Sequence, residues 1–222
     1  MRVKDCGEFP LIKRLMDVET GGRGIIVPSG DDAAIVEISP GRMVVFTCDC
    51  MVENVHFLPA SHATDVGFKL MSSCISDIAA MGGVPLYALV TLVVPGDCSV
   101  QWVEDLYRGL RLSADQEAIK LVGGDTSSGQ SIMVNVSLLG EIEPCGHMLR
   151  KLAQPGDLVC VTGPLGGSAA GLEIVLGNVS VDDPSAKEAL AAHFRPKSKI
   201  KVARQLAAAG CRCANDISDG LG

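Results

Sequence analysis

Aspartates at turns and at the ends of predicted elements are the residues in this sequence best suited to chemistry. Carboxylate oxygens are preferred ligands for hard divalent cations such as Mg²⁺, which proteins often share with substrate phosphates. Aspartate also caps helices and favours turns, so local structure alone accounts for any one of these positions. For the set as a whole, a metal site explains the pattern equally well. Its candidate ligands are Asp31, Asp32, Asp49, Asp77, Asp125, Asp216 and Asp219.

The familiar nucleotide-binding motifs are missing from the sequence. It contains no G-x-x-x-x-G-K-[ST] loop, no kinase catalytic loop and no D-F-G, so the usual phosphate-binding lysine is absent. A phosphate substrate would therefore need metal ions to neutralise its charge. The glycine-rich segment 123–129 could hold phosphate through backbone N–H groups, although such a segment is more often only a turn. G-x-S-x-G and H-E-x-x-H are absent too, which leaves serine hydrolase and zinc peptidase functions without support.

Composition restricts the partners and the compartment. The chain of 222 residues has a net charge of −7 and a pI of about 5.1, so no basic field attracts nucleic acid. No apolar stretch reaches the roughly 20 residues that span a bilayer, and the first residues do not form a signal peptide. We therefore predict a cytoplasmic protein that binds neither nucleic acid nor membrane.

The cysteines indicate reduced thiols. Their odd number, nine, does not suit a disulfide framework in a chain with no secretion signal. The C-x-C pairs at 48–50 and 211–213 lack the spacing of a structural zinc site. Small buried apolar side chains are the better explanation of these residues.

The first two thirds of the sequence predict an α+β domain over residues 1–143. Buried strands are expected at 42–49, 86–94 and 131–142, and a further strand should run into the glycine-rich turn near 123. Apolar spacing predicts a helix over 64–81 capped by Thr64, and an amphipathic helix capped by Ser99. Asp77 lies near the end of the first helix, where the helix dipole disfavours a carboxylate. Asp77 should therefore have a compensating cation or hydrogen bond.

A second, α/β domain is predicted over residues 144–222. It should begin with a strand at 157–163, followed by a small-residue helix at 166–177. A polar linker at 182–184 and helices near 185–193 and 197–209 follow, before a short strand leading to Asp216. The final S-D-G-L-G would normally lead into another helix, so we expect this domain to be truncated.

Sequence blocks along the whole chain resemble the thiamine-monophosphate kinase family. They read GEF at 7–9, SGDDAA at 29–34, TCDCMVENVHF at 47–57, SDIAAMGGVP at 76–85, GGDT at 123–126, RKLAQPGDLVCVTGPLGGSAAGL from Arg150 and DISDGL at 216–221. The family belongs to a superfamily that includes aminoimidazole ribonucleotide synthetase, selenophosphate synthetase and a hydrogenase maturation protein. G-E-F, N-x-H-F and R-x-x-A-x-P-G-D favour the kinase, whereas GGDT and A-A-M-G also fit the hydrogenase relative.

The resemblance implies an ATP-binding N-terminal domain of the aminoimidazole ribonucleotide synthetase type, which pairs its sheet with that of a second subunit to form a homodimer. It also implies that a C-terminal α/β domain closes over ATP and Mg²⁺. The positions that match the family's metal ligands are Asp32, Thr47, Asp49, Asp77, Asp125, Asp216 and Asp219. Gly124, Asp125, Arg150 and Ser218 match ATP contacts, and His56 matches a contact to the phosphorylated substrate. Without the resemblance, an ion pair would explain Arg150, and ordinary packing or capping would explain His56 and Ser218.

The implied reaction is the ATP- and Mg²⁺-dependent phosphorylation of thiamine monophosphate to thiamine diphosphate. Phosphate already ionised near neutral pH is a ready nucleophile, so direct in-line transfer requires no covalent intermediate and no catalytic side chain. The alternatives are another ATP-using member of the superfamily, such as a hydrogenase maturation protein, and a non-catalytic nucleotide-binding module. Cys48 and Cys50 replace hydroxyl residues of the family pattern and could alter the metal geometry. The family's contacts to the thiamine ring lie beyond the part of the pattern that this chain contains.

Overall fold

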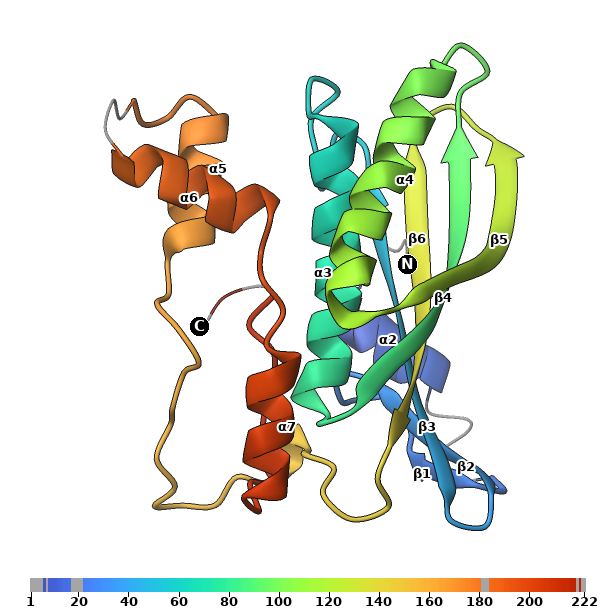
Figure 1. Cartoon of the computed structure of the whole chain (residues 1–222), viewed down its shortest axis with the longest axis vertical. Coiled ribbons are helices and arrows are strands. Elements are labelled where there is room, and N and C mark those ends of the chain that lie inside the picture. Colours follow the sequence, from blue (N-terminus) through green and yellow to red (C-terminus); the bar gives the residue numbers. More distant parts are fainter. Residues whose placement is uncertain (1–5, 7, 17–21, 181–183, 219, 221–222) are drawn as a thin grey trace.

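A single six-stranded sheet organises the N-terminal part of the molecule (Figure 1). The computed structural model describes residues 6, 8–16, 22–180, 184–218 and 220. In spatial order the strands are β1 (Ile25–Val27), β2 (Ala34–Ser39), β3 (Arg42–Val52), β6 (Met133–Ile142), β4 (Val84–Val94) and β5 (Lys120–Ser128). Only β4 and β5 pair in parallel; the other neighbours are antiparallel.

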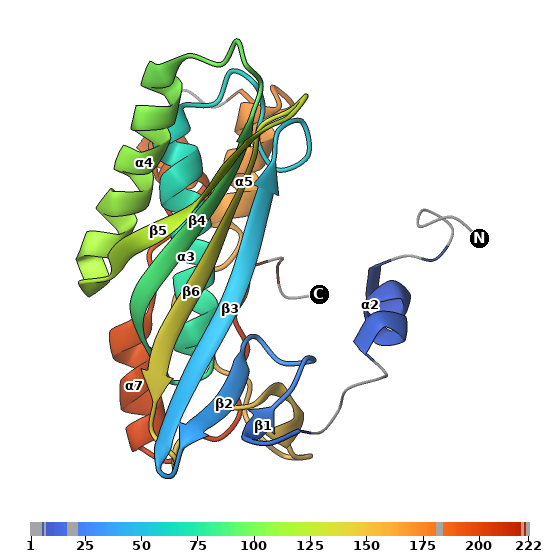
Figure 2. The same cartoon turned by 90° about the vertical axis from the view of Figure 1, so that its right-hand side faces the viewer.

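Two long helices cover one face of the sheet. They are α3 (Ala63–Ala80), which is seen behind the strands in Figure 2, and α4 (Val100–Ala114), which is seen to the left of them. Ala88, Val90 and Leu92 of β4 are fully or almost fully buried under these helices, as period-two alternation requires. The two helices approach closely because glycines occupy their contact. A Cβ atom on Gly109 would lie 1.9 Å from the carbonyl oxygen of Thr64.

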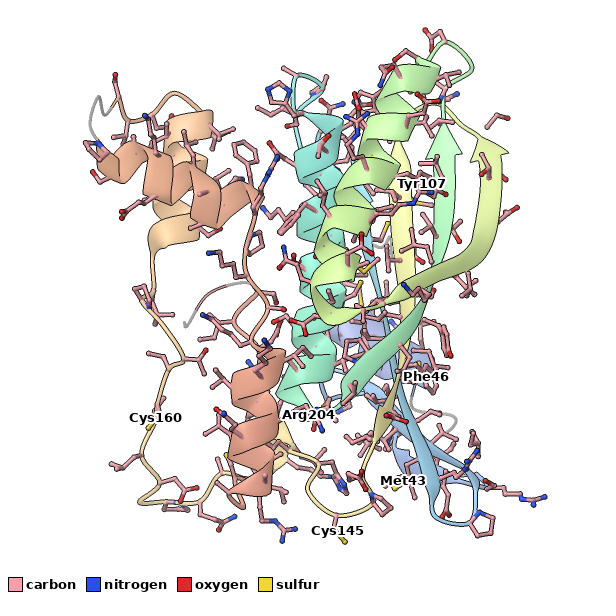
Figure 3. All side chains as sticks on the ribbon, viewed as in Figure 1. Met43, Phe46, Tyr107, Cys145, Cys160 and Arg204 are labelled. Carbon is pink, nitrogen blue, oxygen red and sulfur yellow. The ribbon has the colours of Figure 1, made fainter. Side chains whose placement is uncertain are left out.

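The other face of the sheet is open and carries apolar side chains. Phe46, Leu139 and Tyr87 are paired across three neighbouring strands and so form one row on this face. Phe46, which is labelled in Figure 3, is 41% exposed, and Tyr87 is 50% exposed. Leu89, on the same face of β4, is exposed as well. Helix α2 (Glu8–Met16) lies apart from the sheet in Figure 2.

The C-terminal part consists of helices in the residues that the structure describes. They are the short 3₁₀ turn η2 (Arg150–Leu152), then α5 (Gly167–Val175), α6 (Pro184–Phe194) and α7 (Ile200–Ala208). Helices α5 and α6 pack against each other, and α7 lies against α3, where Ile200 and Ala203 join the buried core. The remaining 3₁₀ turn, η1 (Asp115–Glu117), follows α4 directly.

The two strands predicted in this part are wrong. Residues 157–163 form an exposed segment, with Leu158 89% and Val159 86% accessible to solvent, and residues 211–217 have no strand pairing either. A strand needs a partner for its backbone N–H and C=O groups. Every regular element described after β6 is a helix, so an apolar sequence alone does not make a strand here.

Other predictions from local patterns are confirmed or need adjustment. The side chain of Ser99 caps α4 by accepting the Trp102 N–H at 3.1 Å, as predicted. Helix α3 begins one residue earlier than predicted, with His62 and not Thr64 at the cap position. The segment predicted as a glycine-rich turn is part of β5, because residues 123–128 pair in register with 89–94 of β4.

No described helix combines the length and hydropathy needed to cross a membrane. All nine cysteines are free thiols in the structure. Cys145 and Cys160 lie on separate loops near the molecular surface (Figure 3).

Candidate functional site

Three aspartates from distant parts of the sequence meet near the C-terminal end of α3. Asp32 precedes β2, Asp77 is in the last turn of α3, and Asp216 follows α7. One carboxylate oxygen from each lies within 4.8 Å of the other two. Like charges this close repel one another strongly unless a proton or a cation intervenes. The cluster is therefore the centre of the candidate site.

Asp77 has the compensating hydrogen bond that its position in the helix predicts. The Thr47 hydroxyl of β3 donates to Asp77 Oδ2 at 2.8 Å. Burial nevertheless raises the pKa of Asp77 to about 8, and the charges of Asp216, Asp49 and Asp32 contribute to the rise. The Thr47 hydrogen bond opposes this shift but is the weaker effect. Without a cation, Asp77 is consequently protonated through most of the neutral range.

Asp32 is paired with Arg150. The Arg150 guanidinium donates from Nε to Asp32 Oδ1 at 3.0 Å and from Nη2 to the same oxygen. The Arg150 backbone N–H also contacts both carboxylate oxygens of Asp31, each at 3.3 Å. The Asp32 side chain has no solvent exposure, whereas that of Arg150 is 46% exposed. Arg150 thus brings the only cationic group that forms a hydrogen bond with the three-aspartate cluster among the described residues.

Asp216 is held by two hydroxyl groups. Ser218 Oγ lies 3.4 Å from Asp216 Oδ1, and the side chain of Ser76 on α3 forms a hydrogen bond with Asp216. Burial and the nearby charge of Asp32 raise the pKa of Asp216, while Ser76, Arg150 and Ser218 lower it.

Two oxygens of the cluster have no hydrogen-bond partner in the described structure. They are Asp32 Oδ2 and Asp216 Oδ2, and both are buried. An unpaired buried carboxylate oxygen is costly, and native proteins usually satisfy it with a donor, water or an ion. Because hard cations prefer carboxylate oxygens, the cluster fits a divalent metal such as Mg²⁺.

Asp49 lies near this cluster, but its cysteine neighbours do not join it. Strand alternation places Thr47 and Asp49 on the face of β3 toward α3, and the Asp49 charge acts on Asp77. Cys48 and Cys50 alternate with them and face the open side of the sheet. Their thiols are therefore not placed to replace hydroxyl ligands among the three aspartates.

The structure does not bring Gly124, Asp125 or His56 to the cluster within one chain. Asp125 pairs with Thr91, in the same row as Asn135 and Cys50, so its side chain is on the open face of the sheet. Gly124 is a glycine for a packing reason, since a Cβ atom there would lie 1.8 Å from the Val90 carbonyl oxygen.

His56 is positioned at the far end of β3. Its Nδ1 accepts the Val52 N–H at 3.0 Å, which leaves the proton of the neutral ring on Nε2. The five-residue step from Thr47 to Val52 spans about 16 Å of strand. His56 lines a cavity of about 210 Å³, bordered by α3, α5 and α6.

One predicted ligand lies outside the described residues, and two contacts were missed. This ligand is Asp219. Ser76 was not identified because nothing in its helix pattern reveals a hydrogen bond to Asp216, 140 positions later. Asp31 was named only as a candidate carboxylate, whereas it accepts the backbone N–H of Arg150. A serine beside a candidate ligand on a helix was the only available signal for Ser76.

Comparisons with known proteins show the family of the chain. The family model for "AIR synthase related protein, N-terminal domain" matches residues 30–142, and the corresponding C-terminal domain model matches residues 154–222. Thiamine-monophosphate kinase from Bacillus subtilis is 38% identical over 218 residues, covering 96% of this chain and 67% of the relative. The Aquifex aeolicus enzyme is 36% identical over 221 residues, covering 100% of this chain and 69% of the relative.

A solved structure with bound small molecules is also similar. It is AaThiL complexed with AMPPCP and TMP, which aligns with a TM-score of 0.84 at 35% identity. The alignment covers 93% of this chain and 64% of that chain. The chain therefore spans about two thirds of the length of the relatives that it matches.

Proposed function

The chain belongs to the thiamine-monophosphate kinase family of AIR synthase related proteins, and we propose that its protein transfers the γ-phosphoryl group of ATP to thiamine monophosphate. The observation that carries the proposal is the partly buried three-aspartate cluster, which has two buried oxygens without a hydrogen-bond partner. The chain that carries it is similar to AaThiL, whose structure is described as complexed with AMPPCP and TMP. Both reacting groups are anionic, so a concentrated set of cation ligands suits this reaction.

We propose that Asp32, Asp77 and Asp216 hold Mg²⁺, with Asp49 and Thr47 supporting them from β3. Mg²⁺ bound there would offset the negative charge of the two phosphate groups and favour their in-line alignment. Thr47 fixes the orientation of the Asp77 carboxylate through its 2.8 Å hydrogen bond, and Ser76 and Ser218 do the same for Asp216. We propose Asp219 as a further Mg²⁺ ligand only because its position matches a metal ligand of the family.

The remaining chemistry requires binding and orientation more than proton transfer. The acceptor phosphate has a second pKa near 6, so it is mostly ionised at pH 7 without a general base. We propose that Arg150, Gly124 and Ser218 contact ATP. His56 can donate from Nε2 to the phosphorylated acceptor, because its Nδ1 is occupied by the Val52 N–H. We propose no protein side chain as a nucleophile in the phosphoryl transfer.

We also propose a homodimer formed through the open face of the sheet. The row of Phe46, Leu139 and Tyr87 is an exposed apolar surface on this face, and such surfaces commonly mark protein interfaces. Asp125 lies on the same face, away from the cluster of its own chain. Pairing two sheets would place Asp125 at the interface, where it could complete a metal site shared with the partner.

Three further proposals concern the whole protein. Residues 1–143 and 144–222 are proposed as parts of two domains, with the ring of thiamine monophosphate contacted by family residues beyond the matched two thirds. The protein is proposed to act in the cytoplasm.

The test is production of ADP and thiamine diphosphate from ATP, Mg²⁺ and thiamine monophosphate by the full-length protein. We expect Asp32→Asn to lower the rate by about 100-fold or more, because it removes a charged ligand while keeping the side-chain volume. Glu104→Gln, an equivalent change at an exposed position on α4, should leave the rate unchanged.

Two results would contradict the proposal. One is the absence of thiamine diphosphate when ATP is bound, which would favour another acceptor or a non-catalytic module. The other is full activity of Asp32→Asn, which would show that the three-aspartate cluster is not the metal site.

A further inference from the structure

The guanidinium of Arg150 contacts the three-aspartate cluster through Asp32, a carboxylate that the proposed metal ion would also bind. We propose that Arg150 is an internal counter-ion that holds Asp32 while the site lacks metal, and that it releases this carboxylate when a divalent cation binds. The freed guanidinium then becomes available to a nucleotide phosphate. This inference rests on the proposed metal site and adds a second state of Arg150 to it.

The geometry of the ion pair favours such an exchange. Both Nε and Nη2 of Arg150 donate to a single oxygen, Oδ1, of Asp32. The second oxygen, Oδ2, is buried without a partner, so the guanidinium satisfies only half of the carboxylate. A bidentate arginine–carboxylate pair would use both oxygens. The unpartnered oxygen is therefore still available as a ligand atom for a metal ion.

The two partners differ in their freedom to move. The Asp32 side chain is completely enclosed, whereas almost half of the Arg150 side chain is exposed. Arg150 can therefore rotate toward solvent without opening the core, and Asp32 remains in place. Replacement of the Arg150 guanidinium by a metal ion at Asp32 therefore requires the rotation of one side chain. It does not require the N- and C-terminal parts of the molecule to separate.

The backbone keeps Arg150 close to the cluster in either state. Its N–H contacts the Asp31 carboxylate, and its carbonyl oxygen accepts from Cys213 Sγ at 3.4 Å. The adjacent Leu149 N–H donates to the Arg212 carbonyl oxygen at 2.9 Å. The segment that carries Arg150 is thus tied to the segment that leads to Asp216. A guanidinium anchored here would stay within reach of phosphate groups bound at the same aspartates.

Charge balance gives the direction of the effect. One guanidinium neutralises one carboxylate, whereas a divalent cation interacts with all three and satisfies the two unpartnered oxygens. Arg150 and the cation therefore compete for Asp32. Removing the guanidinium should strengthen cation binding in the absence of nucleotide and weaken nucleotide binding in its presence. The two effects have opposite signs, and a purely structural role of Arg150 would not produce that combination.

The experiment is a Mn²⁺ titration of the full-length, nucleotide-free protein, in which electron paramagnetic resonance measures the concentration of free Mn²⁺. We expect Arg150→Gln to lower the dissociation constant for Mn²⁺ by about tenfold, comparable to the effect of one nearby charge on a buried carboxylate. Arg150→Lys should fall between this variant and the wild type. Lys151→Gln removes the same charge from an exposed neighbour and should change the constant by less than about twofold. Asp32→Asn should weaken Mn²⁺ binding in every background.

The same proteins are then titrated with the non-hydrolysable ATP analogue AMPPCP in the presence of Mn²⁺. Weaker analogue binding by Arg150→Gln, together with its tighter Mn²⁺ binding, supports the counter-ion. Unchanged or weaker Mn²⁺ binding by Arg150→Gln overturns it while leaving the metal site intact, provided that Asp32→Asn lowers Mn²⁺ binding. If Arg150→Gln does not fold, Arg150→Lys decides by the same criterion. If the wild type binds no Mn²⁺, the metal site and the counter-ion both fail.

Discussion

At the scale of single residues, the site is dominated by carboxylates for which the cost of burial exceeds the stabilisation from their hydrogen bonds. Asp77 illustrates this balance, because Thr47 donates to it at 2.8 Å and yet its pKa rises to about 8. Burial is the larger effect, and the neighbouring aspartates add to it. A group of this kind binds a proton when no metal is present and offers a charged ligand when one arrives. Protons and metal ions therefore compete for the same oxygens.

This competition predicts a pH dependence of stability in the metal-free protein. The pKa of Asp77 is raised from 3.8 in the unfolded chain to about 8 in the folded one, so the folded state binds the extra proton between these values. The stabilisation is complete below the unfolded pKa and is lost as the pH rises through the folded pKa. In chelator, the melting temperature should fall from pH 5.5 to pH 8.5.

The control for this prediction is Asp77→Asn, which cannot titrate but can still accept from Thr47. Its melting temperature should depend less on pH than that of the wild type over the same range. Added Mg²⁺ should raise the wild-type melting temperature more at pH 8.5 than at pH 5.5, because the ligand is already deprotonated. Equal pH slopes for the two proteins would exclude Asp77 as the source.

At the scale of elements, the position of the site depends on how closely α3 approaches its neighbours. Helix α3 carries Ser76 and Asp77, and its packing against α4 is set by Gly67 and Gly109. A Cβ atom on Gly67 would lie 2.1 Å from the carbonyl oxygen of Leu106, and Gly109 has a similar contact with Thr64. The glycines permit contact between the helix backbones, and this fixes α3 over the sheet.

Gly109→Ala should therefore destabilise the protein by about 2 kcal/mol, even though alanine is the better helix former. Chemical denaturation monitored by circular dichroism measures the change. Gly96→Ala is the matched control, because its Cβ atom would meet nothing within 4 Å, and its free energy of unfolding should stay close to that of the wild type. A stabilising effect of Gly109→Ala would mean that α3 and α4 can move apart without lowering the free energy of unfolding.

At the scale of the whole molecule, one face of the sheet is covered and the other is not. Helices α3 and α4 cover one face of the sheet (Figure 2). Strand pairing places Asp49 on the covered face and Phe46, Tyr87 and Asp125 on the open face. The cluster, on the covered side, contains residues from both ends of the described chain. The open face would be covered by a second copy in the proposed homodimer.

A charged side chain at the centre of that face should separate the subunits. We expect Phe46→Asp to weaken self-association by about 100-fold, in the range found when an aromatic interface residue is lost. Sedimentation equilibrium of the full-length protein measures this. Leu112→Asp replaces an equally exposed apolar residue on α4 and should leave association unchanged. A dimer that persists in Phe46→Asp, with loss of association in Leu112→Asp, would place the interface on the helices.

Local patterns in the sequence were sufficient for most of the N-terminal elements. Apolar spacing indicated α3 to within a residue at each end, and Ser99 identified the start of α4. Alternation in 131–142 indicated β6, whose buried and exposed residues do alternate. These patterns succeed because helix and strand periods act over a few neighbouring residues. The same patterns failed at 157–163, where a strand would have required a partner from elsewhere.

The sequence by itself determined the family, the supply of carboxylates and the expectation that Asp77 needs a partner. Only the tertiary structure decided that Asp32, Asp77 and Asp216 meet, that Asp125 is on the other face, and that Arg150 contacts Asp32. The physical reason is separation along the chain. Strand register decides the face of each side chain, and packing between distant segments decides which charges share a buried space. Neither is encoded in the spacing of nearby residues.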